Sequence, residues 1–186
     1  MTPILLASAS PRRRELFSHM GFPFTVTSVD TDETVQPGED ADSAARRLAL
    51  DKARAARPQN PHGVVVGCDT LVVIDGDILG KPKDQNEARA MLARLSGREH
   101  RVVTAFAVIF ADGREVVEAP STTVRFRPMT EAEIAAYVAT GEPMDKAGAY
   151  GIQERGAVFV EGVTGDYFTV VGLPLCRLYQ ALVKMD

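Results

Sequence analysis

The sequence of 186 residues contains no tryptophan, only two cysteines and only three histidines. His19, His62 and His100 are scattered along the chain without the spacing of metal ligands, so a zinc site is not expected. Cys68 and Cys176 both lie in apolar stretches. Two buried free thiols are therefore expected instead of a disulfide, in keeping with a reducing compartment.

The sequence also lacks a long apolar run and an excess of basic residues. No run approaches the roughly 18 residues that span a bilayer, so no membrane partner is expected. The run Ile4–Ala7 is too short for a signal peptide, and arginines follow it instead of preceding it, which favours a cytoplasmic location. The net charge is −4, which argues against a nucleic-acid partner. No Gly-x-Ser-x-Gly motif, Cys/His pairing or dinucleotide fingerprint indicates a covalent nucleophile or a nicotinamide cofactor.

What is present is an ordinary globular composition, with 45% hydrophobic and 25% charged residues. The length suffices for one sizeable core or for two small lobes sharing one. Strand-like runs alternate with helix-like runs in the first half, and a hairpin-rich stretch follows. This order predicts an α/β fold, with a mixed sheet and helices around it. No linker or internal repeat is visible, so residues 1–186 are predicted to form a single domain, with two lobes around a cleft.

The expected elements follow from hydrophobic periodicity and capping signals. Strands are expected at residues 4–7, 22–29, 64–67, 71–74, 78–79, 101–110, 114–117, 123–127, 157–163 and 167–171. Helices are expected at residues 11–20 and 39–57, after Asp84, after Thr130 and from Pro174. Asp84 and Thr130 are each followed three residues later by glutamate, as in a capping box.

The most informative segment is Ser8–Arg14, which follows the first expected strand. Pro11 suits the first position of a helix, so consecutive arginines fall in the first helical turn. Cations there oppose the helix dipole. Two interpretations stay open: a solvated basic face, or a bound anion such as a polyphosphate held by helix amides and guanidinium groups.

Two charged residues interrupt apolar segments. Asp69 follows the apolar run 64–68, and ligands of open α/β sheets bind beyond the carboxyl ends of strands. Its carboxylate either holds magnesium or takes a proton from water, or it caps the following turn. Lys52 falls within an apolar stripe of the second expected helix, so its ammonium group either reaches out to solvent or points into a cleft.

Two further segments combine small residues with cations. Gly80-Lys81-Pro82 fails the pattern of a Walker loop, but Lys81 can still address a phosphate as a point charge. The segment 145–153 holds Lys146, several small residues and Gln153. It is either a structural loop or a place of close ligand approach, where Lys146 contacts substrate and Gln153 reads a base edge.

Taken together, these segments resemble the Maf family of nucleotide pyrophosphatases over nearly the whole chain. The motifs that carry the resemblance are Leu6-Ala7-Ser8-Ala9-Ser10-Pro11-Arg12-Arg13, Gly67-Cys68-Asp69-Thr70, Gly80-Lys81-Pro82, Leu95-Ser96-Gly97, Asp145-Lys146-Ala147-Gly148-Ala149-Tyr150-Gly151-Ile152-Gln153 and Val171-Gly172-Leu173-Pro174. The resemblance implies an elongated fold with a central cleft, similar to inosine triphosphate pyrophosphatases, and often a homodimer. It also implies hydrolysis of a nucleoside triphosphate to the monophosphate and pyrophosphate with a divalent cation, magnesium or manganese.

The resemblance assigns roles to individual residues. The proton-accepting aspartate of the family matches Asp69, which with Glu33 would also hold the metal. Positions that handle the triphosphate and the metal match Ser8, Arg13, Glu33, Lys52 and Lys81. Positions that sort family members by substrate match Arg12, Thr70 and Gln153. These three residue types look like the branch that acts on dTTP and UTP, whereas the branch that acts on 7-methyl-GTP has Trp, Gln and Glu there.

Two alternatives to a dTTP/UTP pyrophosphatase stay open. One is a pyrophosphatase for 7-methyl-GTP or another modified nucleotide, and the other is a nucleotide-binding regulator of cell division with little catalysis. The full set of acidic and basic residues favours an enzyme, because a regulator needs no positioned water. Metal-assisted attack of water on the α-phosphorus is the expected chemistry.

Overall fold

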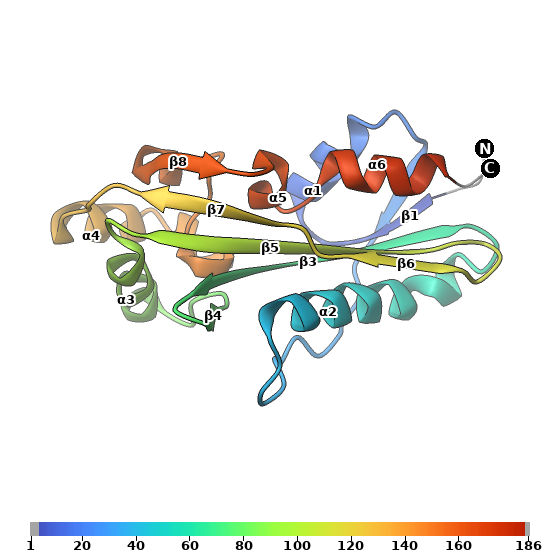
Figure 1. The fold of residues 1–186 in the computed structure, drawn as a ribbon, viewed down its shortest axis with the longest axis horizontal. Helices are drawn as coiled ribbons and strands as arrows, with labels where there is room; N and C mark the ends of the chain where they lie inside the picture. Colours follow the sequence, from blue (N-terminus) through green and yellow to red (C-terminus); the bar gives the residue numbers. More distant parts are fainter. Residues whose placement is uncertain (1–3, 185–186) are drawn as a thin grey trace. The chain divides into compact units, whose positions relative to one another are not determined.

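The computed structural model describes residues 4–184. Its strands form a mixed sheet in the order β2-β1-β3-β5-β7-β8, with β4 beside β3 and β6 beside β5 (Figure 1). The strands are β1 Ile4–Ala7, β2 Phe24–Thr27, β3 Val64–Ile74, β4 Asp77–Leu79, β5 Glu99–Ile109, β6 Glu115–Glu118, β7 Ser121–Phe126 and β8 Val160–Thr164. The helices are α1 Pro11–Ser18, α2 Ala41–Ala56, α3 Gln85–Leu95, α4 Glu131–Ala139, α5 Tyr167–Val171 and α6 Leu175–Val183. The predicted α/β class, a mixed sheet with flanking helices, is confirmed.

The chain divides into two compact units. The first comprises Met1–Asp69, Thr104–Pro120 and Gly172–Asp186, and the second comprises Thr70–Val103 and Ser121–Val171. Strands β3 and β5 contribute residues to both. The cleft between two lobes within a single domain stays a prediction.

The first unit is built on a parallel core. Strand β1 is buried throughout and pairs in parallel with β2 and β3. Helix α2 lies on one side of these strands, with α1 and α6 on the other (Figure 1). The apolar stripe of α2 faces inward as the alanine-rich pattern predicts, and Lys52 lies within it. The unit therefore carries a lysine on the buried face of its longest helix.

Strand β3 does not end at Cys68, contrary to the prediction. It runs unbroken from Val64 to Ile74, so Asp69 lies within the strand. The parallel neighbour β1 stops earlier, where Ala7 pairs with Gly67. Asp69 therefore does lie just beyond the end of the parallel pairing, although not at the end of its own strand. A carboxylate is tolerated there because it has a charged partner, described below.

The second unit is mostly antiparallel. Strand β7 pairs with β5 and with β8, and a tight turn at Asp75 and Gly76, both with positive φ, joins β3 to β4. Helices α3 and α4 pack against each other. The capping box at Thr130 and Glu133 is complete, whereas Asp84 caps its helix without the reciprocal bond, because the Glu87 carboxylate accepts instead from the Lys83 amide.

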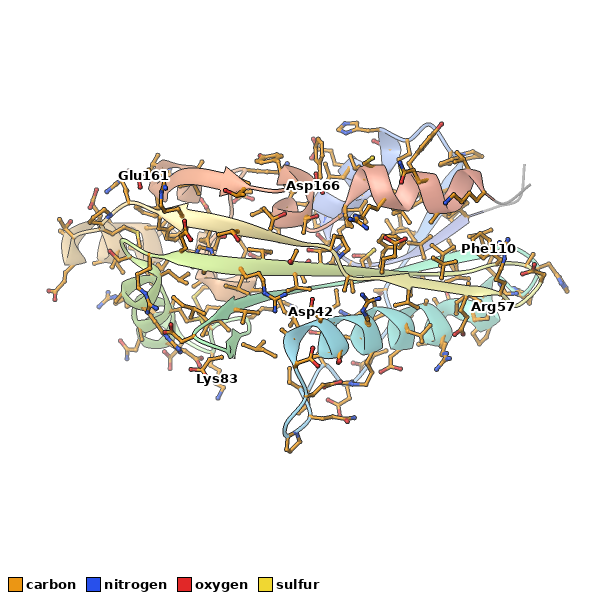
Figure 2. The ribbon with its side chains drawn as sticks, in the orientation of Figure 1. Asp42, Arg57, Lys83, Phe110, Glu161 and Asp166 are labelled. Atoms are coloured by element: carbon orange, nitrogen blue, oxygen red, sulfur yellow. The ribbon has the colours of Figure 1, made fainter. Side chains whose placement is uncertain are left out.

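One expected strand near the C-terminus is wrong in type, and another begins later than expected. Residues 167–171 form helix α5, because the Asp166 carboxylate (Figure 2) accepts hydrogen bonds from the amides of Phe168 and Thr169. Residues 155–159 form a 3-10 helix, so β8 begins only at Val160. The apolar, β-branched composition of residues 167–171 resembles a strand, and the cap at Asp166 overrides that preference.

Smaller differences concern exposure and length. Strand β2 is shorter than residues 22–29, and α1 ends before Met20. Cys68 is buried as expected, but Cys176 is exposed, and both thiols are free. On α6 the side chain of Tyr179 is 45% exposed. Within residues 4–184, no helix is long and apolar enough to cross a membrane.

Candidate active site

The turn after β1 is organised by two serines. Ser10 caps α1 by accepting a hydrogen bond from the Arg13 amide (3.4 Å), with Pro11 at the first helical position. Ser8 is buried, and its hydroxyl oxygen accepts from the Ser10 amide (3.2 Å). No acidic residue lies in the first turn of α1. The predicted arrangement, cations at the positive end of a helix, is therefore confirmed.

Arg13 is oriented by a segment far along the sequence. Its Nε donates to the carbonyl oxygen of Gly172 at 2.8 Å. Gly172 has φ +119°, a backbone conformation that favours glycine. This bond uses the Nε–H of the guanidinium group and fixes the direction of the side chain. Arg12 is partly buried beside it, whereas Arg14 is exposed.

Lys52 joins two predicted carboxylates: Asp69, which follows an apolar run, and Glu33, which only the family resemblance indicated. Its Nζ donates to Oδ1 of Asp69 at 2.5 Å and lies 2.7 Å from Oε1 of Glu33. Lys52 is 9% exposed and Asp69 is 7% exposed, whereas Glu33 is half-exposed. The two interpretations of Lys52 are thus resolved: its ammonium group is buried and paired and does not reach out to solvent.

Gly67 allows this contact by its lack of a side chain. A Cβ atom there would lie 2.2 Å from the carbonyl oxygen of Ala49 and 2.7 Å from the amide nitrogen of Ala53. The backbones of α2 and β3 are therefore packed as closely as glycine permits. The close approach brings the helix that carries Lys52 against the strand that carries Asp69.

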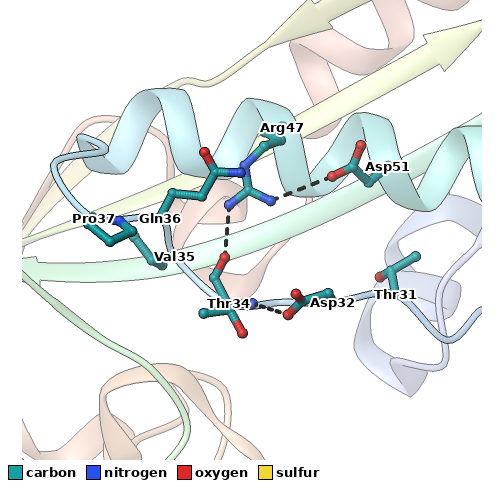
Figure 3. A pocket seen from close by; sticks show the side chains of 8 residues that line it. All are labelled: Thr31, Asp32, Thr34, Val35, Gln36, Pro37, Arg47 and Asp51. Carbon is teal, nitrogen blue, oxygen red and sulfur yellow. Dashed lines mark hydrogen bonds and ion pairs between the residues drawn. The ribbon is translucent and has the colours of Figure 1, made fainter.

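The segment that carries Glu33 is held to α2 at a second point. Arg47 donates to the carbonyl oxygen of Thr34 at 3.0 Å and pairs with Asp51 (Figure 3). It also pairs with Glu39. Thr34 and its neighbours line a pocket of about 460 Å³ against this helix. Sequence reasoning missed Arg47, whose only signal was its charge, five positions before Lys52 on the same helix.

The Asp69 and Glu33 carboxylates supply the type of oxygen ligand that a divalent cation such as magnesium prefers. Magnesium is commonly bound by one or two carboxylates, with substrate phosphates and water completing the shell. Both carboxylates converge on a single Nζ atom, so both lie within reach of one bound cation. Among residues 4–184, no group of three or more His, Cys, Asp or Glu side chains is placed to hold a metal ion without such help.

Cys68, next to Asp69 in β3, is not a nucleophile candidate. Burial raises the pKa of its thiol to about 11, even though the Arg13 and Lys52 cations act in the opposite direction. A thiol with this pKa stays protonated near neutral pH and reacts poorly. The Cys68 thiol is therefore not expected to attack a substrate.

In the second unit, two predicted segments come together. The amide of Gly148 donates to the carbonyl oxygen of Gly80 at 3.1 Å, so the segment of Lys81 lies against the segment 145–153. Gly148 has φ +69°, and a Cβ atom there would lie 2.9 Å from the side chain of Val72. Glycine is therefore required at this crossing for both conformation and space.

Lys146, a predicted substrate contact, is held by neighbouring residues within the second unit. It is buried, and its Nζ donates to the Glu142 carbonyl oxygen (2.8 Å) and to the Asp145 carboxylate (2.9 Å). The Glu154 carboxylate lies 3.5 Å away. The protein itself thus occupies the donors of this lysine, which favours the alternative of a structural loop for Lys146.

Gln153 and Thr70 complete the predicted set. Gln153 is exposed, so its amide is available to a ligand. Thr70 follows Asp69 in β3 and is partly buried. Because successive side chains of a strand point to opposite faces, Thr70 does not share the face of Asp69.

Comparison with known proteins places this arrangement in a family. A dTTP/UTP pyrophosphatase of Symbiobacterium thermophilum is 49% identical over 99% of this chain and 94% of its own length. A dTTP/UTP pyrophosphatase of Moorella thermoacetica is 51% identical over 98% of this chain and 94% of its own length. Two solved structures share the fold. The Ham1 protein of Staphylococcus aureus has a TM-score of 0.58 and 14% identity, with 99% of this chain and 100% of that chain covered. A HAM1 protein of Coxiella burnetii has a TM-score of 0.55 and 17% identity, with the same coverage of both chains. The family model of the Maf-like protein matches residues 3–185, and the chain belongs to this family.

Proposed function

We propose that the chain hydrolyses dTTP and UTP to the nucleoside monophosphate and pyrophosphate. The observation that supports this most directly is the buried ion pair of Lys52 with Asp69, joined by Glu33. A water-activating carboxylate beside a phosphate-directed cation is what attack on a phosphoric anhydride requires. The relatives named dTTP/UTP pyrophosphatase, matched over nearly the whole chain, support the same reaction and substrates.

In the proposed mechanism, the Asp69 carboxylate orients a water molecule for in-line attack on the α-phosphorus and accepts its proton. Arg13, Lys52 and Lys81 hold the β- and γ-phosphates and offset the charge that develops on the leaving pyrophosphate. Ser8 and Ser10 support this by fixing the start of α1, whose amides suit phosphate oxygens.

Asp69 and Glu33 are the proposed ligands of a magnesium or manganese ion. When bound, such an ion polarises a phosphoryl oxygen and makes a bound water more acidic. The half-exposed Glu33 can turn away from Lys52 at little cost, because its carboxylate keeps contact with solvent.

Arg12, Thr70 and Gln153 are the proposed determinants of base selectivity. Thymine and uracil differ by one methyl group, which is worth about 1–3 kcal/mol in an apolar pocket, so one site serves both. Cytosine reverses the donor and acceptor pattern at two positions. A site with fixed partners rejects such a base by roughly 10⁴-fold, provided that the Gln153 amide cannot rotate.

We also propose a cytoplasmic location and a homodimer. The two free thiols fit a reducing compartment. The exposed apolar side chains of Val26, Tyr179 and Val183 are compatible with a covered surface in the first unit. Sedimentation equilibrium of the purified chain tests the dimer, and a concentration-independent monomer mass would rule it out.

The substrate assignment is tested by pyrophosphate release over a panel of dTTP, UTP, CTP, GTP and 7-methyl-GTP, with magnesium, with manganese and with excess EDTA. The proposal expects turnover of dTTP and UTP with either metal and loss of turnover with EDTA. Preferred turnover of 7-methyl-GTP would contradict the substrate assignment. Nucleotide binding without pyrophosphate release would instead favour a regulator.

A further inference from the structure

We propose that Tyr137 and Glu142 are positioning residues that set base selectivity by fixing the turn that carries Gln153. The inference deepens the proposed function, because it rests on the role given there to Gln153. The two residues have no direct place in the chemistry. They belong to the second unit, on α4 and just after it.

The Glu142 carboxylate holds the far end of the turn. Its Oε2 accepts from the amide of Arg155 at 3.2 Å, and its Oε1 accepts from the amide of Gly156 at 3.1 Å. The same Oε1 accepts from the Tyr137 hydroxyl at 2.7 Å. Three donors thus converge on one carboxylate, each a charge-assisted bond.

The Tyr137 hydroxyl holds the near end. Its oxygen accepts from the amide of Gly151 at 3.2 Å while its proton goes to Glu142. Tyr137 is 5% exposed, and burial followed by the bond to Glu142 raises the pKa of its phenol. The hydroxyl therefore stays protonated and serves as donor and acceptor together. Residues 151–156, with Gln153 between the two ends, are thus tied to one pair of side chains.

Close packing reinforces the hydrogen bonds. A Cβ atom at Gly151 would lie 2.6 Å from Cε of Lys146, and one at Gly156 would lie 2.6 Å from the Gly151 carbonyl oxygen and 2.8 Å from the Tyr137 hydroxyl. The Lys146 ammonium in turn donates to the Glu142 carbonyl oxygen. Lys146 thereby gains a role as a support of the turn instead of a substrate contact.

Base selectivity by Gln153 requires that the backbone of the turn be fixed. A glutamine amide can present either its oxygen or its nitrogen to a base, so Gln153 alone cannot separate uracil from cytosine. Selectivity requires a backbone that offers the amide in one place and orientation. Gly151 and Gly156, at the ends of the turn, are buried, whereas Gln153 is exposed. The ends of the turn are therefore held in place while the Gln153 amide stays accessible to a base.

The test measures the ratio of kcat/KM for dTTP to that for CTP in Tyr137→Phe and Glu142→Gln. Tyr137→Phe removes one oxygen atom and keeps the ring packed against Phe159, so the fold should be retained. We expect each variant to lower the ratio by about tenfold, the value of one or two lost hydrogen bonds. We also expect faster hydrogen exchange at the amides of residues 151–156, which is measured without substrate.

Glu133→Gln is the matched control. Glu133 lies on the same helix as Tyr137, caps that helix through Thr130 and pairs with Arg127 at 2.8 Å, so its interactions are directed to residues other than the turn 151–156. It should weaken α4 without changing the ratio or the exchange of the turn. An unchanged ratio in Tyr137→Phe and Glu142→Gln, while Gln153→Ala lowers it, would overturn the positioning role. An unchanged ratio in Gln153→Ala would instead overturn the role of Gln153 in the proposed function.

Discussion

The Nζ atom of Lys52 lies 2.5 Å from Oδ1 of Asp69, with both side chains about nine-tenths buried. Removal of one partner from a buried pair leaves an uncompensated charge. We predict that Lys52→Met lowers the free energy of unfolding by about 3 kcal/mol. The double variant with Asp69→Asn should lose less than the sum of the single losses, by more than about 1 kcal/mol. Urea denaturation of the four proteins measures this coupling.

The surface pair of Arg54 with Glu115 is the control for that cycle. Its atoms are 2.9 Å apart, but the Arg54 side chain is 57% exposed. Its coupling should stay below about 1 kcal/mol. Strict additivity of the Lys52 and Asp69 variants would show that the two residues do not interact in solution.

Gly67→Ala should both destabilise the protein and reduce turnover. The added methyl group meets the backbone of α2, which cannot move without carrying Lys52 away from Asp69. Overpacking of this kind costs about 1–3 kcal/mol. Thermal unfolding and pyrophosphate release are the measurements. Gly162→Ala is the control, because the nearest atom there, at 3.3 Å, is the tip of the flexible Arg125 side chain. Equal effects of both variants would remove the special role of Gly67.

Arg13→Lys keeps the charge but loses the planar fork and the Nε bond to Gly172. We predict a fall in kcat/KM for dTTP of about tenfold, in line with one lost charge-assisted hydrogen bond. Arg14→Lys is the matched control, because Arg14 is exposed and has no assigned role. A comparable loss in the Arg14 variant would indicate that only the net basic charge of this segment matters.

His100 gives the stability of the protein a pH dependence. Burial lowers its pKa from 6.5 to about 4, and its Nε2 lies 2.7 Å from the Tyr150 hydroxyl. The unfolded chain therefore takes up a proton at higher pH than the folded chain. The contribution of neutral His100 to the free energy of unfolding is complete above pH 6.5. It is lost as the pH drops towards 4, by roughly 3 kcal/mol in total.

The measurement is the melting temperature from pH 7 to pH 5, a window above the range in which most carboxylates titrate. Glu39 and Glu133, whose pKa values arginine partners lower to about 2, add their own losses only below this window. His100→Phe should flatten the profile. An equally steep profile in that variant would assign the dependence to another group.

The sequence predicts an element best when the residues that determine it lie within that element. The helix caps at Asp84 and Thr130 were predicted from the sequence, because a cap needs only its own turn. The helix at residues 167–171 was not, since its apolar residues favour a strand and Asp166 decides the outcome.

The same distinction applies to the candidate site. Lys52 in an apolar stripe and Asp69 after an apolar run are visible in the sequence, and the structure brings them together. The resemblance, not the pattern of residues, singled out Glu33. Tyr137 and Glu142 gave no signal, because their partners are backbone amides several residues away. The burial of Lys146 and its bonds to Glu142 and Asp145 were not visible, because sequence shows a charge but not its surroundings.

The most direct test of the account compares the wild-type protein with Asp69→Asn. Asparagine keeps the size of the side chain but cannot accept the proton of water. Pyrophosphate release from dTTP and equilibrium binding of dTTP are measured with magnesium, with Asp77→Asn as a control for loss of a surface carboxylate. The account predicts that Asp69→Asn binds dTTP but loses turnover by at least about 10²-fold. Turnover at the wild-type rate in Asp69→Asn would contradict it.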